Sequence, residues 1–285
     1  MGYVTMLEEI AGRLRAAGCV FAEDEARLLI GSSRTPAHLE SMIGQRVGGL
    51  PLEQVLGWAE FCGLRIAVEP GVFVPRRRTG HLVDLAVAGL GPGAVVVDLC
   101  CGTGAVGAVV ARRVPGVEVH AADVDPAAAR CAARNLPGDR VYCGDLYAAL
   151  PRRLRGRADV LVCNAPYVPT GEIAHMPPEA RDHENRVALD GGADGLDVQR
   201  RVVAGAGEWL APGGRLLIET GAHQAAATAA AFRAAGLSAG VSADEELAAT
   251  VVSGTWPGPP AAPAGGTPAA SRGARSRAHP VERGE

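Results

Sequence analysis

The chain has 285 residues, of which 48% are hydrophobic and 21% are charged, and its formal net charge is −3. This length suffices for one large domain or two smaller ones with a sizeable buried core. The slight excess of negative charge argues against a general binder of nucleic acids or membrane surfaces, because such proteins are clearly basic.

Several features predict a cytoplasmic protein without a metal site. No apolar run approaches ~20 residues, so we expect no transmembrane helix and no membrane partner. The N-terminal stretch MGYVTMLEEIAGRL reaches acidic residues too early for a secretory signal peptide. The seven cysteines form no C-x-x-C pair and the histidines form no H-x-x-x-H pair. We therefore expect reduced, mostly buried thiols and no bound metal.

Residues 1–57 predict a small helical domain. A capping-box pattern at Thr5 and Glu8 indicates a first helix, and residues 23–30 indicate a second. The pair Thr35-Pro36 has the N-cap and N1 residues of a third helix.

A linker, residues 58–78, follows the helical domain. Its stretch FCGLRIAVEPGVFVPR, residues 61–76, alternates between apolar and polar residues and carries Pro-Gly at 70–71. This pattern predicts a β-hairpin, or two short strands, between the two halves of the chain.

Strands and helices then alternate over residues 79–253. We expect strands at 94–99, 118–122, 141–143, 159–163 and 215–219, and helices at 79–88, 105–113, 126–135, 197–210 and 223–235. Nearly continuous apolar strands separated by helices predict an α/β fold with a parallel, doubly wound sheet. Residues 237–241 and 248–252 predict a closing antiparallel pair. Residues 254–285, rich in Pro, Gly, Ala and Arg, predict a disordered tail.

The first strand of this region runs into a glycine loop, VVVDLCCGTGAVG. Gly102, Gly104 and Gly107 spell G-x-G-x-x-G, and Asp123 follows nineteen residues after Gly104. Glycines let the backbone approach a ligand, and an acidic residue after the second strand accepts hydrogen bonds from ribose hydroxyls. Dinucleotides and S-adenosylmethionine both fit this geometry.

Asp98, just before the loop, favours S-adenosylmethionine. A carboxylate at this position would repel the pyrophosphate of a dinucleotide, which sits over the helix N-terminus. S-adenosylmethionine carries an ammonium and a sulfonium instead, and both are stabilised by a nearby carboxylate. Asp145, after the third strand, is either an acceptor for the adenine amino group or an ordinary helix N-cap.

The motif NAPY, residues 164–167, ends the strand DVLVC. Asn164 offers both a donor and an acceptor, Pro166 fixes φ, and Tyr167 adds a flat apolar face with a polar tip. These residues predict either a cradle for a planar polar group or a simple turn after a strand.

Taken together, GVFVPR at 71–76, VDLCCGTGAVG at 97–107, Asp123, GD at 144–145 and NAPY at 164–167 resemble the HemK/PrmC family. Members of that family are S-adenosylmethionine-dependent methyltransferases, which modify the side-chain amide of the glutamine in the Gly-Gly-Gln motif of class-I peptide-chain release factors. The likeness spans roughly residues 45–253. It implies a helical N-terminal domain for substrate recognition, a hairpin linker and a seven-stranded Rossmann-like methyltransferase sheet.

The resemblance also implies roles for individual residues. The methionine end of the cofactor would lie at Asp98, Cys100, Gly102 and Gly104. Asp123 would bind the ribose, and Asp145 with Leu146 the adenine. The catalytic residues would be those of the NAPY motif: Asn164, Ala165, Pro166 and Tyr167. Asn164 would also contact the cofactor. The substrate would contact Asn164, Tyr167, Phe73 and Pro75.

Three positions depart from the family's pattern. Ala165 replaces the second residue of N-P-P-Y, Cys100 replaces the first loop glycine, and Gly80 replaces the acidic residue after Thr79. The helical domain is also short. We expect Cys100 to have an ordinary backbone conformation in place of the freedom of glycine.

The chemistry that the resemblance implies needs acceptors and no strong base. A carboxamide nitrogen is a poor nucleophile, but acceptors at Asn164 and the Ala165 carbonyl would polarise it and aim it at the methyl group. Arg181, His183 and Glu184 follow the motif in a loop that either closes over the site or exposes its charges to solvent.

We therefore predict a protein-glutamine N-methyltransferase that acts in translation termination, with release factors as partners. A DNA or RNA amino-methyltransferase is a second reading, but the chain has no basic recognition domain, so nucleic acid is not expected as a direct substrate. A small-molecule N-methyltransferase and a cofactor-binding protein without catalysis are the remaining alternatives.

Overall fold

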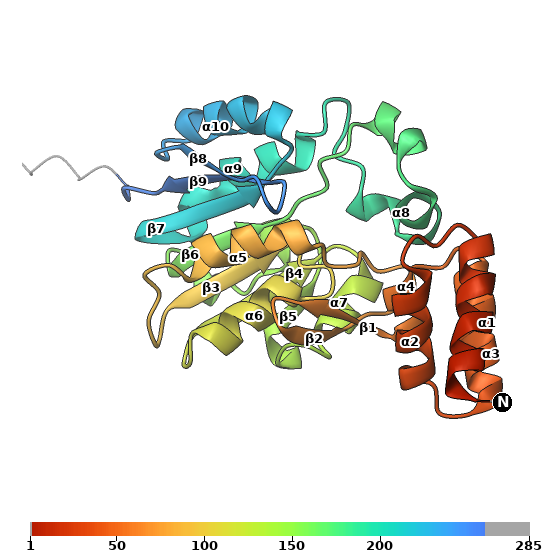
Figure 1. Cartoon of the computed structure of the whole chain (residues 1–285). Coiled ribbons are helices and arrows are strands. Elements are labelled where there is room, and N and C mark those ends of the chain that lie inside the picture. The colour runs from red at the N-terminus through yellow and green to blue at the C-terminus, as the bar shows by residue number, and fades with distance from the viewer. Residues whose placement is uncertain (1, 260–285) are drawn as a thin grey trace, which may run out of the picture.

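The computed structural model describes residues 2–259, in which four helices stand beside a seven-stranded sheet (Figure 1). The four helices are α1 (Tyr3–Ala16), α2 (Ala22–Ser32), α3 (Pro36–Val47) and α4 (Leu52–Leu56). Their apolar faces form a separate core that includes Leu14, Leu29 and Ile43. We refer to residues 3–56 as the helical unit.

Of the two helix N-caps predicted from the sequence, the structure contains one. Thr35 caps α3 as predicted, since its hydroxyl accepts a hydrogen bond from the amide of His38 over 3.1 Å. Helix α1, however, begins at Tyr3, and no side chain caps it. The predicted capping box at Thr5 and Glu8 is therefore wrong, because both residues already lie inside the helix.

The linker contains one hairpin, β1 (Trp58–Phe61) and β2 (Leu64–Ala67). The turn lies at Cys62-Gly63, where both residues have positive φ. The Pro-Gly signal at 70–71 is not the turn of this hairpin. The hairpin lies within the predicted linker, with β1 beginning three residues before the stretch 61–76 and β2 inside it. Phe61 and Ile66 pack against the main sheet and so join the hairpin to it.

The main sheet has the order β5-β4-β3-β6-β7-β9-β8. Its strands are β3 (Val95–Leu99), β4 (Glu118–Asp123), β5 (Val141–Cys143), β6 (Ala158–Cys163), β7 (Leu210–Glu219), β8 (Gly240–Asp244) and β9 (Ala249–Thr255). The first five run parallel, and β9 runs antiparallel to both β7 and β8. The predicted doubly wound α/β fold with seven strands is confirmed.

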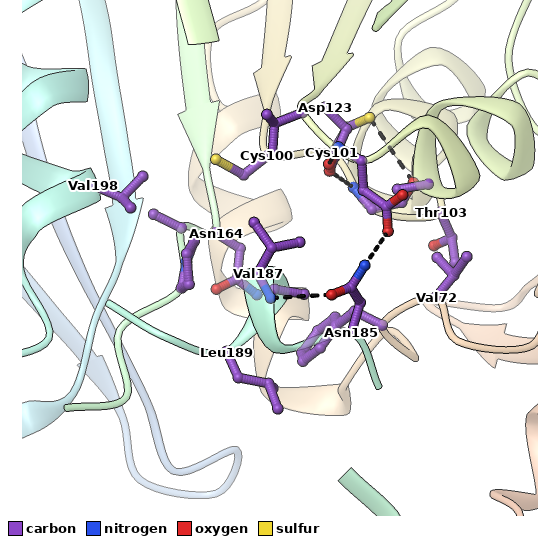
Figure 2. Close-up of a pocket in the computed structure, with 18 of the residues that line it drawn as sticks. Val72, Cys100, Cys101, Thr103, Asp123, Asn164, Asn185, Val187, Leu189 and Val198 are labelled. Atoms are coloured by element: carbon purple, nitrogen blue, oxygen red, sulfur yellow. Dashed lines mark hydrogen bonds between the residues drawn. The ribbon is translucent and has the colours of Figure 1, made fainter. Parts of the chain in front are cut away.

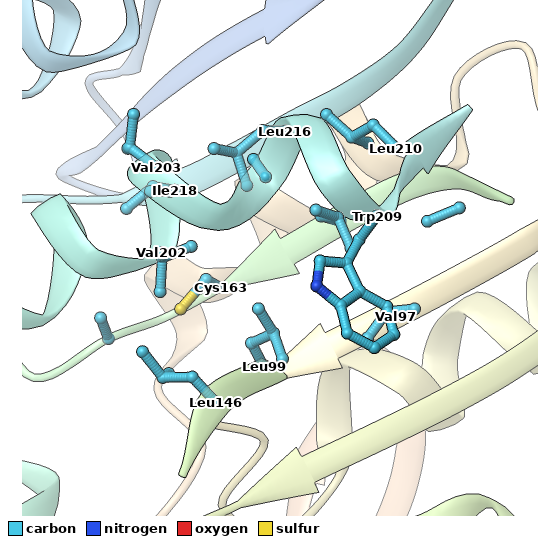
Figure 3. Packing of buried hydrophobic residues seen from close by; sticks show 14 of the residues in the cluster. Val97, Leu99, Leu146, Cys163, Val202, Val203, Trp209, Leu210, Leu216 and Ile218 are labelled. Carbon is cyan, nitrogen blue, oxygen red and sulfur yellow. The ribbon is translucent and has the colours of Figure 1, made fainter. Parts of the chain in front are cut away.

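Helices cover both faces of this sheet. Helices α5 (Gly80–Val87), α6 (Ala105–Arg113) and α7 (Pro126–Ala132) pack on one face, and α9 (Asp197–Trp209) and α10 (Ala225–Ala234) pack on the other. Figure 3 shows the second core, in which Trp209 lies among side chains from β3, β6 and β7. Burying each large apolar side chain stabilises the fold by about 1.5–3 kcal/mol.

The register between β6 and β7 places the carboxyl ends of these two strands side by side. From Val160 and Arg215 onward β6 and β7 pair regularly, and Cys163 lies opposite Ile218. The residues that follow this pair are Asn164 and Glu219. Both strands end at the same edge of the sheet, because they are parallel.

Strand β9 ends at Thr255, and Gly254 pairs with Leu216 of β7. The sheet therefore extends two residues past 253, into the segment predicted as tail. Residues 260–285 of that predicted tail lie outside the described residues. Within residues 2–259, each helix is too short or too polar to cross a membrane.

Candidate active site

A cavity of about 410 Å³ opens at the carboxyl ends of β3, β4 and β6. Its size suits a small cofactor together with part of a substrate. Twelve of the thirteen predicted site residues line it: Phe73, Pro75, Asp98, Cys100, Gly102, Asp123, Asp145, Leu146, Asn164, Ala165, Pro166 and Tyr167. Figure 2 shows Cys100 and Asn164 among the lining side chains. The structure thus brings the glycine loop and the NAPY motif into one cavity.

Gly104 is the predicted residue that does not line the cavity. It caps α6 with a φ of 72°, and an added Cβ would lie 3.1 Å from side chains of Ala132 and Leu136. Its lack of a side chain therefore serves the sharp turn and the close packing of α6. Its effect on the cavity is indirect, through the position of the loop.

Asp98 is buried at the floor of the cavity, with 2% of its surface exposed. Burial raises the pKa of its carboxyl to about 7, even though the amide of Gly107 donates a hydrogen bond to it over 3.0 Å. The nearby Asp123 carboxyl raises this pKa further. Within residues 2–259 Asp98 forms no ion pair, so no positive side chain offsets its charge.

Asp123 accepts two backbone hydrogen bonds, one of which holds the glycine loop. Its carboxyl accepts from the amide of Gly102 over 2.8 Å and from the amide of Asp125 over 2.9 Å (Figure 2 shows the first). Burial raises the pKa of Asp123, and these amide donors oppose that shift. The buried Asp98 and the partly buried Asp123 therefore face one cavity, which is an environment for a cation.

Cys100 corrects one expectation. Its φ is +55°, in the left-handed region, so it adopts the glycine-like conformation that we did not expect of it. A non-glycine residue in this region costs about 1–2 kcal/mol. The chain keeps the shape of the loop at that position and accepts the strain.

Asp145 lies at the rim of the cavity, where it pairs with an arginine of α9. Arg201 donates to one oxygen of Asp145 over 2.5 Å, and more than half of each side chain is exposed. The neighbouring Leu146 is nearly buried and has a positive φ of 45°. The N-cap alternative is not supported, since the Asp145 side chain caps no backbone amide of the turn that follows.

Asn164 points into the cavity and is oriented by Thr79. Its amide nitrogen donates a hydrogen bond to the Thr79 hydroxyl over 3.3 Å. No described residue donates to its carbonyl oxygen, which therefore can accept a hydrogen bond from a ligand. Tyr167 lies at the same end, and burial beside Glu219 raises its pKa to about 12, so the phenol stays neutral at physiological pH.

The chain after NAPY crosses the mouth of the cavity as a strap, residues 168–196, which contains α8 (Pro178–His183). Bridges tie Gly71 to Glu184 and Val168 to Asp190. Val187 and Leu189 of the strap line the cavity (Figure 2).

The three strap residues named from the sequence, Arg181, His183 and Glu184, differ in their exposure. Arg181 is exposed and His183 is partly buried, whereas the Glu184 side chain is fully buried. It accepts hydrogen bonds from the amide of Val74 and from Arg76, over 3.1 and 2.6 Å. Glu184 therefore anchors the strap against residues 73–76 of the linker and is no solvated charge.

The helical unit touches this strap directly (Figure 1). Gln54 of α4, which is buried, donates to the carbonyls of Val72 and His183 and accepts from the amide of Gly71. Arg46 of α3 forms an ion pair with Glu179 of α8 over 2.7 Å. The helical unit, the linker and the strap are thus joined at one edge of the cavity.

The sequence reasoning missed several residues at the site. They are Gln54, Arg78, Thr79, Asn185, Arg201 and Glu219. Glu219 carried a usable signal, because a carboxylate that ends a predicted parallel strand must lie at the ligand-binding edge. For the others the sequence offers no local pattern. No cluster of three potential metal ligands occurs among residues 2–259.

Comparison with known proteins places this geometry in a family. A model of the methyltransferase small domain matches residues 64–176. The release factor glutamine methyltransferase of Mycolicibacterium smegmatis is 38% identical over 231 residues, which cover 79% of this chain and 82% of that protein. The chain belongs to the release factor glutamine methyltransferase family. It is a methyltransferase, as predicted from the motifs.

Two further matches bear on this family assignment. A 4-amino-L-phenylalanine/4-methylamino-L-phenylalanine methyltransferase of Streptomyces pristinaespiralis is 36% identical over 255 residues, covering 81% of this chain and 87% of that protein. The crystal structure of a methyltransferase from Pyrococcus furiosus superposes with a TM-score of 0.51 at 18% identity, over 69% of this chain and 90% of that one. The latter match supports the fold alone.

Proposed function

We propose that this protein transfers the methyl group of S-adenosylmethionine to the side-chain amide of the glutamine in the Gly-Gly-Gln motif of class-I release factors. The observation that carries the proposal is that Asn164, a carboxamide with an available oxygen, shares one cavity with the buried carboxyl of Asp98 and the partly buried carboxyl of Asp123. Relatives of the chain that are named release factor glutamine methyltransferases support the choice of substrate.

The residues present fit this cofactor. Asp98 and Asp123 lack positive partners within residues 2–259, and a ligand with an ammonium and a sulfonium would supply the missing charge. Asp98 and the loop from Cys100 to Gly102 would hold the methionine end, Asp123 the ribose, and Asp145 with Leu146 the adenine. When bound, S-adenosylmethionine supplies a methyl group on a positively charged sulfur.

The protein's own task is to hold and orient the substrate amide. Thr79 fixes the Asn164 side chain, so that its oxygen accepts from one N–H of the substrate carboxamide. The carbonyl of Ala165 accepts from the other N–H, and Tyr167 and Phe73 pack against the planar group. The two acceptors raise electron density on the substrate nitrogen and aim its lone pair, so that orientation lowers the barrier. The bond from the nitrogen to the methyl group would form as the bond from sulfur to that methyl breaks, and the methylated nitrogen, now positively charged, would lose a proton to water. No strong base is therefore needed at this site.

Residues 1–57, which contain the helical unit, are proposed as the part that recognises the protein substrate, with 58–78 as linker and 79–253 as the catalytic domain. The contacts of Gln54 and Arg46 with the linker and the strap support this division of roles. A cytoplasmic location follows from the proposed substrate, since release factors act on ribosomes.

A labelled methyl transfer tests the proposal. The purified chain is incubated with S-adenosylmethionine and a class-I release factor, and the Gly-Gly-Gln peptide is analysed by mass spectrometry. We expect the mass of one methyl group on the glutamine, and no transfer to a release factor whose motif is Gly-Gly-Glu. An unchanged peptide mass at saturating cofactor contradicts the proposal.

A second candidate is N-methylation of an aromatic amine on a free amino acid. The Streptomyces pristinaespiralis relative, which is named for such a substrate, matches this chain over most of its length. Incubation with 4-amino-L-phenylalanine in the same assay distinguishes the two functions. Neither of the two relatives is named for a nucleic-acid substrate.

A further inference from the structure

Arg78 places a guanidinium at the wall of the cavity, beside Tyr167. It lies in a short 3-10 helix, Arg77–Thr79, and 43% of its side chain is exposed. The guanidinium carbon is 5.8 Å from the centroid of the Tyr167 ring. Because the next residue, Thr79, orients Asn164, this guanidinium lies at the substrate end of the cavity.

A buried carboxylate holds this guanidinium in place. Glu219, at the end of β7, is 1% exposed, and its Oε1 accepts from Arg78 Nε over 3.2 Å and from the Tyr167 hydroxyl over 3.5 Å. The second carboxylate oxygen, Oε2, is buried without a hydrogen-bond partner among the described residues. Glu219 therefore has Arg78 as its charge partner, and this pairing orders a side chain that would otherwise be flexible.

The pairing leaves most of the guanidinium available. Arginine carries five N–H donors, and the Nε–H is the one that Glu219 uses. The Tyr167 hydroxyl is a second hydrogen-bonding neighbour of the guanidinium, and the remaining N–H donors of Arg78 have no partner among residues 2–259. A planar, pre-oriented group of donors beside a cavity suits an oxygen acceptor such as a carbonyl or a carboxylate.

We propose that Arg78 is a specificity-determining residue that donates hydrogen bonds to a backbone carbonyl oxygen of the substrate peptide, next to the glutamine that is methylated. The inference rests on the proposed function and names the second anchor of the same site. The two glycines before the glutamine have no side chains, so their carbonyls are open to a bulky donor. A free amino acid would present its carboxylate to the same guanidinium.

The variants must avoid leaving a buried charge without a partner. Removing Arg78 alone would leave Glu219 unpaired, which is strongly destabilising. The double variant Arg78→Met with Glu219→Gln removes both charges. Glu219→Gln alone is the matched control, because its amide oxygen still accepts from Arg78 Nε. Arg77→Ala is a second control, since Arg77 is exposed and does not line the cavity.

The test is to measure three quantities for each variant. These are the Kd of a Gly-Gly-Gln peptide for protein loaded with S-adenosylhomocysteine, the KM and kcat for that peptide, and the Kd of the cofactor. The double variant should bind the peptide about tenfold or more weakly than Glu219→Gln, with the corresponding rise in KM. Its cofactor affinity and thermal unfolding should match those of Glu219→Gln. Equal peptide affinity in the double variant and in Glu219→Gln would overturn the inference.

The experiment distinguishes a peptide carbonyl from the carboxylate of a free amino acid as the ligand of Arg78. It also distinguishes failure of this inference from failure of the proposed function. If the wild type binds the peptide without methylating it, the proposed function fails and the binding comparison still decides the role of Arg78. The wild type could instead bind 4-amino-L-phenylalanine and not the peptide. If the double variant then binds this amino acid as tightly as Glu219→Gln does, Arg78 does not bind a carbonyl of the substrate and the inference is overturned. A wild type that binds neither ligand overturns the inference.

Discussion

Asp98 and Gly107 are joined across the glycine loop, where the amide of Gly107 donates to Oδ2 of Asp98 over 3.0 Å. A donor of this kind favours the charged carboxylate, yet the pKa of Asp98 is raised to about 7 by burial. The loss of hydration therefore outweighs the hydrogen bond. A cation bound next to this carboxyl would reverse the balance.

The affinity for S-adenosylmethionine should consequently rise with pH through about 7. Below this pH Asp98 is protonated and offers no charge to the cofactor, and binding must release a proton. Calorimetry in buffers of different ionisation enthalpy between about pH 5.5 and 8.5 measures both effects. Asp98→Asn should bind more weakly and without this pH dependence at Asp98. An affinity that is flat across the range contradicts the role given to Asp98.

The same carboxyl affects the stability of the cofactor-free protein. Its folded pKa, about 7, lies above its ordinary value of 3.8, so the folded state binds more protons between these values. The contribution of Asp98 to stability is therefore present at low pH and lost as pH rises through about 7. In urea unfolding, Asp98→Asn should gain stability relative to the wild type as pH rises. A constant difference between the two proteins is the opposing result.

Asn164→Ala should separate chemistry from cofactor binding. Loss of the acceptor should lower kcat about 10²-fold or more, by analogy with the removal of a single transition-state hydrogen bond. The Kd of S-adenosylmethionine should stay within about twofold, because Asp98 and Asp123 are intact. Thr79→Val, which removes only the orienting hydroxyl, should have an intermediate kcat. Full activity of Asn164→Ala would exclude it from catalysis.

Cys100→Gly should stabilise the fold relative to Cys100→Ala. Both variants lose the thiol, but glycine alone relieves the strain of a φ of +55°. We expect a difference of about 1 kcal/mol in the free energy of unfolding, measured with urea. Equal stability of the two variants would show that the left-handed conformation at this position carries no strain.

Gln54→Ala should loosen the contact between the helical unit and the strap. The change leaves the carbonyls of Val72 and His183 and the amide of Gly71 without their partner. We expect a loss of about 2 kcal/mol in stability and faster hydrogen exchange at Gly71. Gln45→Ala, on an exposed position of α3, is the control and should leave both quantities unchanged. The same loss in both variants contradicts a specific bridge.

The parts of this structure that were predicted correctly depend on local patterns. Buried parallel strands appear as apolar runs, so β3, β4 and β6 were found within one or two residues. Strand ends then place Asp98, Asp123 and Asn164 at one edge of the sheet without further information. Thr35-Pro36 was sufficient to start α3 because the cap and the fixed φ act within one turn.

The parts that were missed depend on contacts between distant residues or on competing signals. Arg78 and Glu219 are 141 residues apart, and no spacing rule relates them. The hairpin turn was misplaced because Pro-Gly at 70–71 is a stronger turn signal than Cys62-Gly63. The left-handed Cys100 shows that the glycine loop, held by Asp123 and α6, overrides the preference of a single residue.

Cys163 of β6 pairs with Ile218 of β7, and this register determines which residues lie at the substrate end of the cavity. Asn164 and Glu219 continue adjacent strands, so a shift of β7 by one residue would bring Thr220 to the place of Glu219 and turn the carboxylate to the opposite side of the sheet. The irregular pairing between β6 and β7 is confined to their first residues, near Ala158. Length changes at the entry of β7 should therefore be tolerable, whereas a single inserted residue after Arg215 would move the Glu219 carboxylate away from the Arg78 guanidinium.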